Sequence, residues 1–369
     1  MIREEHLEMY ELTLTAKAPV FIGSGKSYVK KEYVFLKPND GRVQSEQVVL
    51  MDEKKLFPML LDRGLVDKYE RFMLGSETNL YRFLTSECGL KLSDIKAASR
   101  YVISASDALD SRHSLKEIYA FVRNAEGRVY VPGSSVKGAL RTILLTDMLL
   151  REKLPRSEAE KKEKSIPEGK YLHTLRLKTD RYGTAEDDPT NSILRGLSIS
   201  DSLPIDDSAM MLGGKIDADV NGNTHKINLC RECIQPGTKL RFKLTLDQSV
   251  LKGRISAESI AAAIRSFDKY YEGTYLSCFR TPRDAAVLSY DNVLLLGGGA
   301  GFLSKTLTYP YLGKREGLRR SIEVFGSSRT AKNHHHEDDE ACGISPRSMK
   351  YVSYGGKLYP YGLCEVTIT

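Results

Sequence analysis

The stretch GSGKS at residues 23–27 carries residue types that bind phosphate, namely glycines, a lysine and a serine. A nucleotide-binding P-loop also requires a glycine five positions before Gly25, where this chain has Val20. It further requires a helix directly after the loop, but the residues from Tyr28 to Phe35 are typical of a strand. The pattern therefore argues against an ATPase and leaves the stretch for another use.

A second glycine-containing stretch, PGSSVKGALR at residues 132–141, predicts the start of a helix with Ser134 or Ser135 as its N-cap. The first turn of a helix offers free backbone amides and a partial positive charge, and here two basic side chains four positions apart share a face near it. This arrangement suits a phosphate, although an ordinary capped helix with two solvated cations has the same spacing. The residues that the stretch offers are Gly133, Ser134, Ser135, Lys137, Gly138 and Arg141.

A third stretch, GGGAGFLSKT at residues 297–306, has four glycines in five positions. Because so many glycines are entropically unfavourable to order, we expect a ligand or another chain to approach closely there; a flexible loop is the alternative. Seven Lys and Arg follow between Lys305 and Lys332, with Tyr309 and Tyr311 among them. Cations hold phosphates and rings stack on bases, so the pattern favours single-stranded nucleic acid, with a solvated basic surface as the alternative.

Signals for metal binding or catalysis are weaker. Cys230 and Cys233 form a single CxxC pair without a second pair at zinc spacing, so we interpret them as structural. The cluster from His334 to Glu340 is rich in His, Asp and Glu, but a polar surface loop is favoured over a divalent-cation site because consecutive histidines cannot all point one way. We assign no catalytic residue, no metal ligand and no cofactor.

The composition is that of an ordinary globular protein of 369 residues, with 41% hydrophobic and 28% charged residues. A net charge of +7 is consistent with an anionic partner. Six scattered cysteines do not suggest a disulfide framework, and no apolar run is long enough for a membrane span. No signal-peptide pattern is present at the N-terminus, so the cytoplasm is the expected location.

Hydrophobic periodicity predicts the elements that would position these stretches. Strands are expected where apolar and polar residues alternate, at 10–16, 196–205, 240–246, 293–296 and 364–368. Helices are expected at 54–62 with Asp52 as a cap, and at 66–73, 115–123, 134–150 and 256–271. Because strand, helix, strand and glycine loop recur, we predict an α+β fold of two ferredoxin-like (RRM-like) domains, residues 1–207 and 208–369, with a polar insertion near 151–190.

These stretches together resemble a known family. YVPGSSVKGALRTILL resembles the glycine-loop signature of the RAMP superfamily, the RNA-binding subunits of CRISPR effector complexes, and APVFIGSGKSYV resembles the loop after the first strand of those proteins. RGLSISDSLPI, RECIQPGTKLRFKLTLD, LLLGGGAGFLSKT, SPRSMKYV and YGLCEVTI are similar, in that order, to one branch, the fifth Csm subunit of type III-A complexes. The resemblance covers nearly the whole chain.

The resemblance implies a non-catalytic subunit that caps the backbone filament of the complex and contacts the 3′ portion of the guide RNA (crRNA). It also implies that cellular nucleases recruited by the subunit mature the 3′ end, in the service of antiviral defence. The implied partners are the guide RNA, target RNA, other Csm subunits (above all the repeated backbone subunit) and those host nucleases, with no membrane. The implied RNA-contacting residues are Gly133, Ser134, Ser135, Lys137, Gly138, Arg141, Gly297, Gly298, Gly299, Gly301 and Lys305, with Lys26 as a lesser candidate.

Two alternatives remain at this point. Some RAMP relatives are RNA-processing endonucleases, and general acid–base cleavage by this chain would need a histidine such as His113, His173 or His335. The chain could also be a different subunit of the same complex, such as the repeated backbone protein, which is generally shorter and lacks the motifs of the second half.

Overall fold

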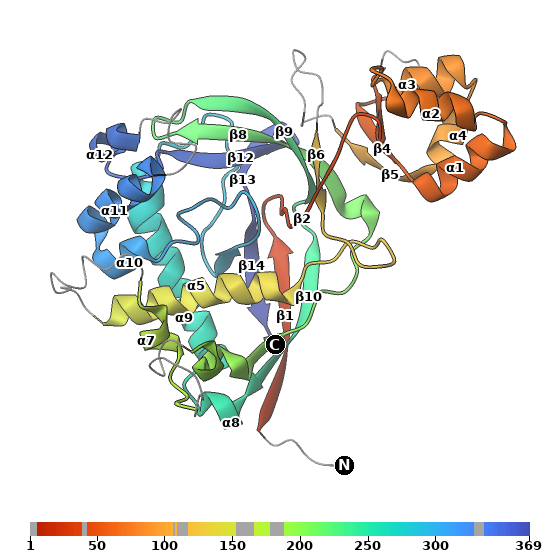
Figure 1. The fold of residues 1–369 in the computed structure, drawn as a ribbon. Helices are drawn as coiled ribbons and strands as arrows, with labels where there is room; N and C mark the ends of the chain where they lie inside the picture. Colours follow the sequence, from red (N-terminus) through yellow and green to blue (C-terminus); the bar gives the residue numbers. More distant parts are fainter. Residues whose placement is uncertain are drawn as a thin grey trace.

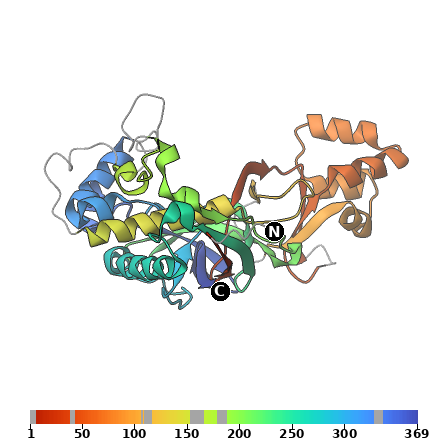
Figure 2. The ribbon, with the colours of Figure 1, turned by 90° about the horizontal axis from the view of Figure 1, so that it is seen from below.

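The structure, a computed structural model, describes residues 6–38, 43–105, 108, 117–152, 166–177, 188–327 and 336–369. Two large β-sheets and their helices form the body, and a smaller helical lobe projects from it, as both views show (Figures 1 and 2). The predicted α+β class is confirmed. In the described part of the chain, every helix is too short or too polar to cross a membrane.

A five-stranded antiparallel sheet forms the centre of the body, in the order β11-β14-β1-β10-β7. Its alternation was predicted correctly: Leu12 and Leu14 of β1, and Phe242 and Leu244 of β10, are all buried. The strands are β1 (Leu7–Ala16), β7 (Leu197–Ile199), β10 (Lys239–Asp247), β11 (Val293–Leu295) and β14 (Leu363–Ile368).

Two long helices, α5 (Gly133–Arg151) and α9 (Ala257–Tyr270), pack against each other, with α5 also contacting β7 and α9 contacting β11. Both were predicted, and their apolar faces are buried through residues such as Leu140 and Ile264. Along the chain the order is β1, α5, β7, β10, α9 and β14, which is the strand–helix–strand repeat of one ferredoxin-like unit. This unit takes its elements from almost the whole length of the chain.

A six-stranded sheet arches over one end of the body in the order β13-β12-β8-β9-β6-β2 (Figure 1). Its strands are β2 (Gly23–Tyr28), β6 (Ile118–Phe121), β8 (Met210–Asp219), β9 (Thr224–Ile234), β12 (Ser348–Tyr354) and β13 (Lys357–Pro360). The helix predicted at 115–123 is wrong, because β6 occupies part of this range. β6 hydrogen-bonds with β2 on one side and with β9 on the other, and this tertiary pairing outweighs the local helical pattern.

Strand pairing crosses the predicted domain boundary at residue 207 in both large sheets. β1 pairs with β10 and β14, and β6 pairs with β9. The division into 1–207 and 208–369 therefore stays a prediction that the pairing does not support.

The helical lobe spans residues 33–104 and was not predicted as a separate unit. Its three-stranded sheet, β3-β4-β5, carries its own core, in which Leu60, Phe72 and Phe83 are buried among the helices. The cap predicted at Asp52 is confirmed, since its carboxylate accepts a hydrogen bond from the amide of Lys54. The elements are β3 (Tyr33–Leu36), β4 (Gln47–Met51), α1 (Glu53–Asp62), α2 (Val66–Leu74), α3 (Leu80–Arg82), α4 (Leu92–Ala97) and β5 (Ser99–Ser104).

Most of the polar insertion predicted near 151–190 lies outside the described residues. Its described part includes α7 (Glu168–Leu172), which contacts α5. The remaining helices are α8 (Gln248–Leu251), α10 (Thr308–Leu312), α11 (Lys314–Gly326) and α12 (Asp339–Cys342). The last three lie together at one side of the body (Figure 1).

Candidate nucleic-acid interface

The loop after β1, just before the GSGKS stretch, meets the Gly297–Gly301 loop in the structure. The amide of Gly298 donates a hydrogen bond to the carbonyl oxygen of Phe21 at 2.7 Å, and Gly297 forms a β-bridge with the same residue. Gly297 has a φ of 82°, and a Cβ there would collide with the Phe21 carbonyl. The loop after β1 and the Gly297–Gly301 loop therefore form one surface.

The glycines of this second loop have different physical roles. Gly299, with a φ of 97°, lies against the ring of Tyr361 and leaves no room for a side chain. Gly301 has a φ of 87° but faces open space. Close packing within the chain thus explains Gly297 and Gly299, whereas Gly301 leaves the backbone accessible to a ligand.

Lys305 is tied back to this loop, since its Nζ donates a hydrogen bond to the carbonyl oxygen of Gly297 at 2.8 Å. Partial burial lowers the pKa of its ammonium group. The Lys305 side chain thus lies beside the loop backbone.

Arg231 of β9 is held beside the same loops. Its guanidinium lies 5.2 Å from the ring centroid of Phe21 and 5.1 Å from that of Tyr361. Its Nη1 atom is buried and has no hydrogen-bond partner among the described residues. A clamped guanidinium with an unused donor is suited to an anion.

Lys350 of β12 interacts electrostatically with Arg231 and with two further lysines, Lys215 and Lys305. Burial lowers the pKa of Lys350, and repulsion from Lys215, Arg231 and Lys305 lowers it further, opposed by the carboxylate of Asp217. Lys215 pairs with that carboxylate at 3.0 Å. We call these five residues, Lys215, Asp217, Arg231, Lys305 and Lys350, the Arg231 cluster.

Sequence analysis found only Lys305 of this cluster. The other members lie on β8, β9 and β12. Arg231 and Lys350 fall within RECIQPGTKLRFKLTLD and SPRSMKYV, two stretches that carried the family resemblance but no site prediction. Pairing of β8 with both β9 and β12 brings them together, which one sequence does not reveal.

The PGSSVKGALR stretch forms the N-terminus of α5, but the N-cap is Pro132 rather than Ser134 or Ser135. Gly133 is the first helical residue and is buried. A Cβ there would collide with the backbone carbonyls of Ile199 and Ser200, so a residue without a side chain is required. The amide of Gly133 donates instead to the carboxylate of Asp201 at 2.9 Å. This close approach to the segment after β7 fixes where the helix begins, so the two serines fall inside its first turn.

The basic residues of this stretch already have partners in the chain. Nζ of Lys137 donates to the carbonyl oxygen of Leu197 at 2.7 Å, and Arg141 forms an ion pair with Glu168. Partial burial lowers the pKa of both groups. Gly138, by contrast, faces open space. The neighbours of this stretch named here, Glu168 and residues 197–201, differ from those of the Gly297–Gly301 loop.

The GSGKS stretch forms β2, an edge strand of the six-stranded sheet, with Lys26 exposed. The prediction of a strand instead of a P-loop helix is confirmed. Lys26 is therefore available at the surface, on the strand that follows the Phe21 loop in sequence.

The prediction that Tyr309 and Tyr311 stack on bases is wrong, because both rings are buried, 0% and 2% exposed. Tyr309 packs edge-on against Tyr275, and its hydroxyl donates a hydrogen bond to the backbone carbonyl oxygen of Ser345.

The basic residues after Lys305 are only partly described. On α11, Arg319 lies beside Glu316 and is largely exposed. Arg329 and Lys332 lie outside the described residues.

The His334–Glu340 cluster is only partly described, since His334 and His335 lie outside the described ranges. Nδ1 of His336 lies 2.9 Å from the buried carboxylate of Asp339, which also accepts a hydrogen bond from Ser345 at 2.7 Å. Within the described ranges, His, Cys, Asp and Glu side chains form no group of three that could hold a metal ion. Of the histidines considered for RNA cleavage, only His173, just after α7, is described.

Cys230 and Cys233, which we interpreted as structural, lie in β9. Both thiols are free and buried, and burial raises the pKa of the Cys230 thiol to about 12. Buried thiols of this kind are poor nucleophiles.

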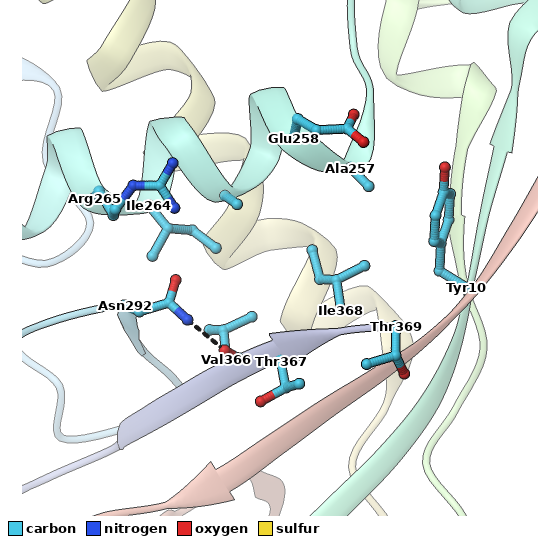
Figure 3. Close-up of a pocket in the computed structure, with 11 residues that line it drawn as sticks. Tyr10, Ala257, Glu258, Ile264, Arg265, Asn292, Val366, Thr367, Ile368 and Thr369 are labelled. Carbon is cyan, nitrogen blue, oxygen red and sulfur yellow. Dashed lines mark hydrogen bonds between the residues drawn. The ribbon is translucent and has the colours of Figure 1, made fainter.

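A cavity of about 420 Å³ lies between α9 and the end of β14 (Figure 3). Glu258 and Arg265 of α9 line one side, and Asn292 donates a hydrogen bond across it to the carbonyl oxygen of Val366 at 2.6 Å. None of its lining residues belongs to the glycine loops or the Arg231 cluster.

Comparison with known protein families shows which family this chain belongs to. The sequence profile of the RAMP superfamily matches residues 13–282, well over half of the chain. The chain belongs to the RAMP superfamily. Membership in this superfamily was predicted from the glycine stretches, two of which lie within the matched residues.

Curated relatives are similar to this chain over most of its length. The CRISPR system Cms protein Csm5 of Mycobacterium tuberculosis is 26% identical over 98% of both chains. Csm5 of Streptococcus thermophilus is 28% identical over 81% of this chain and 80% of its own. The predicted resemblance to the fifth Csm subunit is confirmed by these relatives.

Solved structures share the fold. A chain in the cryo-EM structure of a Csm–crRNA–target RNA ternary complex of a type III-A CRISPR-Cas system aligns over 97% of this chain and 100% of its own, with a TM-score of 0.63 and 18% identity. The crystal structure of T. onnurineus Csm5 aligns over 96% and 99%, with a TM-score of 0.57 and 16% identity.

Proposed function

We propose that this chain is the Csm5-type, RNA-binding subunit of a type III-A CRISPR effector complex and that it contacts the 3′ region of the guide RNA. The similarity to Csm5 proteins over nearly the full length supports the subunit assignment. A structural neighbour that belongs to a Csm–crRNA–target RNA complex supports guide RNA, target RNA and other Csm subunits as partners.

One observation carries the RNA-binding proposal: the loop after β1 and the Gly297–Gly301 loop meet near four cations. The Gly297–Gly301 loop packs on Phe21, and Lys215, Arg231, Lys305 and Lys350 lie around them with Asp217 as the counter-charge. Lys, Arg and exposed backbone amides are the groups that bind phosphate in nucleic-acid complexes. Binding is therefore expected to weaken steeply with salt and to depend little on base sequence.

The N-terminus of α5 is a second contact in this proposal. Ser134 is exposed there, and Gly138 leaves the helix surface open. Lys137 and Arg141 can turn to phosphate only by exchanging their present partners, so we expect them to contribute less than the Arg231 cluster.

In this account the subunit positions RNA and does not cut it, and recruited nucleases trim the 3′ end. The exposed Lys26 and the open space at Gly301 are consistent with a binding surface.

A second ferredoxin-like domain stays a prediction. The sequence pattern that suggested it, formed by β10, α9, β11 and residues 297–301, shares β10 and α9 with the unit built on β1, α5, β7 and β14.

The proposal is tested on the intact complex purified from its host with tagged wild-type subunit, with Lys26→Ala plus Lys305→Ala, or with Lys137→Ala plus Arg141→Ala. The 3′ ends of the bound RNA are then sequenced and subunit content is quantified. We expect the Lys26/Lys305 variant to blur or shift the 3′ ends while the other subunits remain assembled. Unchanged 3′ ends and RNA content in both variants would contradict a role at the guide 3′ end.

The non-catalytic assignment has a separate test. Wild-type chain and His173→Ala are incubated with labelled guide precursor. Cleavage products that depend on His173 would favour the endonuclease alternative, and equal absence of products supports the binding role.

A further inference from the structure

We propose that the Arg231 cluster is a pocket for one backbone phosphate of single-stranded RNA, at the point where the strand crosses the Gly297–Gly301 loop. The inference rests on the RNA-binding function proposed above and assigns that function to particular atoms. Only Lys305 among these residues belongs to a glycine-loop motif.

The geometry of Arg231 is the first argument. Rings of Phe21 and Tyr361 lie about equally far from the guanidinium, 5.2 and 5.1 Å, and hold it beside the glycine loop. The planar fork of a guanidinium matches two oxygens of a phosphate, and prior immobilisation reduces the entropy lost on binding. Its buried Nη1, which lacks a hydrogen-bond partner in the described part of the chain, is a donor that such an oxygen would satisfy.

Charge is the second argument. Lys350 interacts with three further cations and one carboxylate, and that carboxylate, Asp217, is paired with Lys215 at 3.0 Å, so the cluster holds an excess of positive charge in the free protein. Lys350 is only partly exposed, and its neighbours Lys215, Arg231 and Lys305 all disfavour its charged form. A bound phosphate would relieve this repulsion, whereas a neutral base would not.

The surroundings favour the backbone of the strand over its bases. Both aromatic rings beside Arg231 are already in contact with the guanidinium, so they are not free faces for base stacking. Gly301 has open space at its α-carbon, which lets a sugar–phosphate chain approach the loop closely. The pocket should therefore bind without regard to base identity.

The test measures binding of fluorescent oligouridine and oligoadenosine to the purified full-length chain by anisotropy, over a series of salt concentrations. Arg231→Ala and Arg231→Lys are compared with Arg128→Ala, which removes the same charge from an exposed arginine paired with Glu126. We expect Arg231→Ala to weaken binding about tenfold or more for both RNAs, as for loss of a charged hydrogen bond. The slope of log K against log salt should fall by about 0.7, the value for one phosphate of a single strand.

Arg231→Lys separates a guanidinium pocket from general attraction. It keeps the charge but loses the fork and the contacts with two rings, so we expect most of the affinity loss to remain. Arg128→Ala should stay within about twofold of wild type. If both Arg231 variants bind RNA like Arg128→Ala, with an unchanged salt slope, the pocket is refuted.

Lys350→Met guards against a folding artefact, because it removes a charge from the cluster without disturbing the Arg231 stack. Weaker RNA binding by this variant, with an intact thermal unfolding transition, supports the pocket even if the Arg231 variants fold poorly; wild-type affinity would overturn it. A wild-type chain that binds neither RNA would instead contradict the proposed function itself.

Discussion

Lys350 is placed where a positive charge is unfavourable for the free protein. Burial and three neighbouring cations lower the pKa of its ammonium group below the ordinary value of 10.5. Because the unfolded chain binds this proton more tightly, protonated Lys350 destabilises the fold at neutral pH, and the penalty disappears only as pH rises toward 10.5. The residue is therefore better explained by ligand binding than by stability.

Lys350→Met should accordingly raise the free energy of unfolding by about 0.5–2 kcal/mol, the usual range for a stabilising substitution. Urea titration at pH 7 measures this change. Lys239→Met, at an exposed position of β10, is the matched control and should stay within about 0.5 kcal/mol of wild type. A clear loss of stability in Lys350→Met would show that the ammonium group supports the fold.

Glu232 is the buried acid next to Arg231 in sequence. It is 1% exposed, and burial raises the pKa of its carboxyl from 4.5 to about 7. The amide of Phe121 donates to it at 2.7 Å, but the nearest nitrogen of Arg123 is 3.9 Å away, too far for a hydrogen bond. Burial therefore prevails over the Phe121 hydrogen bond and the attraction of Arg100, both of which lower the pKa.

Because the folded pKa lies above the unfolded value, the stability that Glu232 contributes is present below about pH 4.5 and is lost as pH rises through about 7. Glu232→Gln removes this dependence. Relative to the variant, wild type should lose up to about 1.4 kcal/mol per pH unit within this window. Urea titrations between pH 4 and 8 test the prediction, and parallel curves for the two proteins would contradict it.

At the scale of elements, α5 contains two glycines with different roles: Gly133 allows close packing, and Gly138 lies on a surface that we propose binds RNA. Gly133 has no room for a Cβ beside Ile199 and Ser200, whereas Gly138 faces open space one turn later. Gly133→Ala should therefore destabilise the protein by about 1–3 kcal/mol through overpacking. Gly138→Ala should stabilise it by about 0.5–1 kcal/mol through helix propensity.

Thermal unfolding measures both changes, and RNA binding by Gly138→Ala adds a functional result. Weaker binding by this stable variant would place RNA against the helix surface at residue 138. The account of α5 fails if both alanines have the same effect on stability.

Elements with regular periodicity could be predicted from the sequence. β10 and α9 each bury one side in the core, and their apolar residues recur with the period of that side. Local pattern and tertiary packing therefore agree. β6 could not be predicted, because its four residues are a strand only through pairing with β2 and β9. The N-cap of α5 was missed for a similar reason, since Asp201, 68 positions along the chain, binds the first helical amide.

The residues of the candidate site also fall into those that the sequence predicts and those that it does not. Glycine loops carry local signals, because positive φ and close backbone approach select glycine at Gly297 and Gly299. Lys215, Arg231 and Lys350 were not predicted as site residues, although Arg231 and Lys350 lie in stretches of the family resemblance, because their proximity depends on how three strands pair. Burial of Tyr309 was likewise invisible in a basic, aromatic stretch.

At the scale of the whole molecule, the chain is interleaved. The first strand lies between two strands from the second half, and the last strand, β14, pairs directly with the first. This arrangement brings the loop after β1 against the loop after β11, which are over 270 positions apart. These two loops therefore form one surface, and removing either end of the chain should disrupt it.

The most direct test of the central claim is crosslinking within the intact complex. Guide RNA carrying 4-thiouridine at single defined positions is irradiated, and crosslinked peptides of this subunit are mapped by mass spectrometry. We predict crosslinks from 3′-proximal positions to peptides that contain residues 20–28, 213–231, 297–305 or 348–361. Crosslinks to this subunit only from 5′-proximal positions, or only to the lobe at 33–104, would contradict the account.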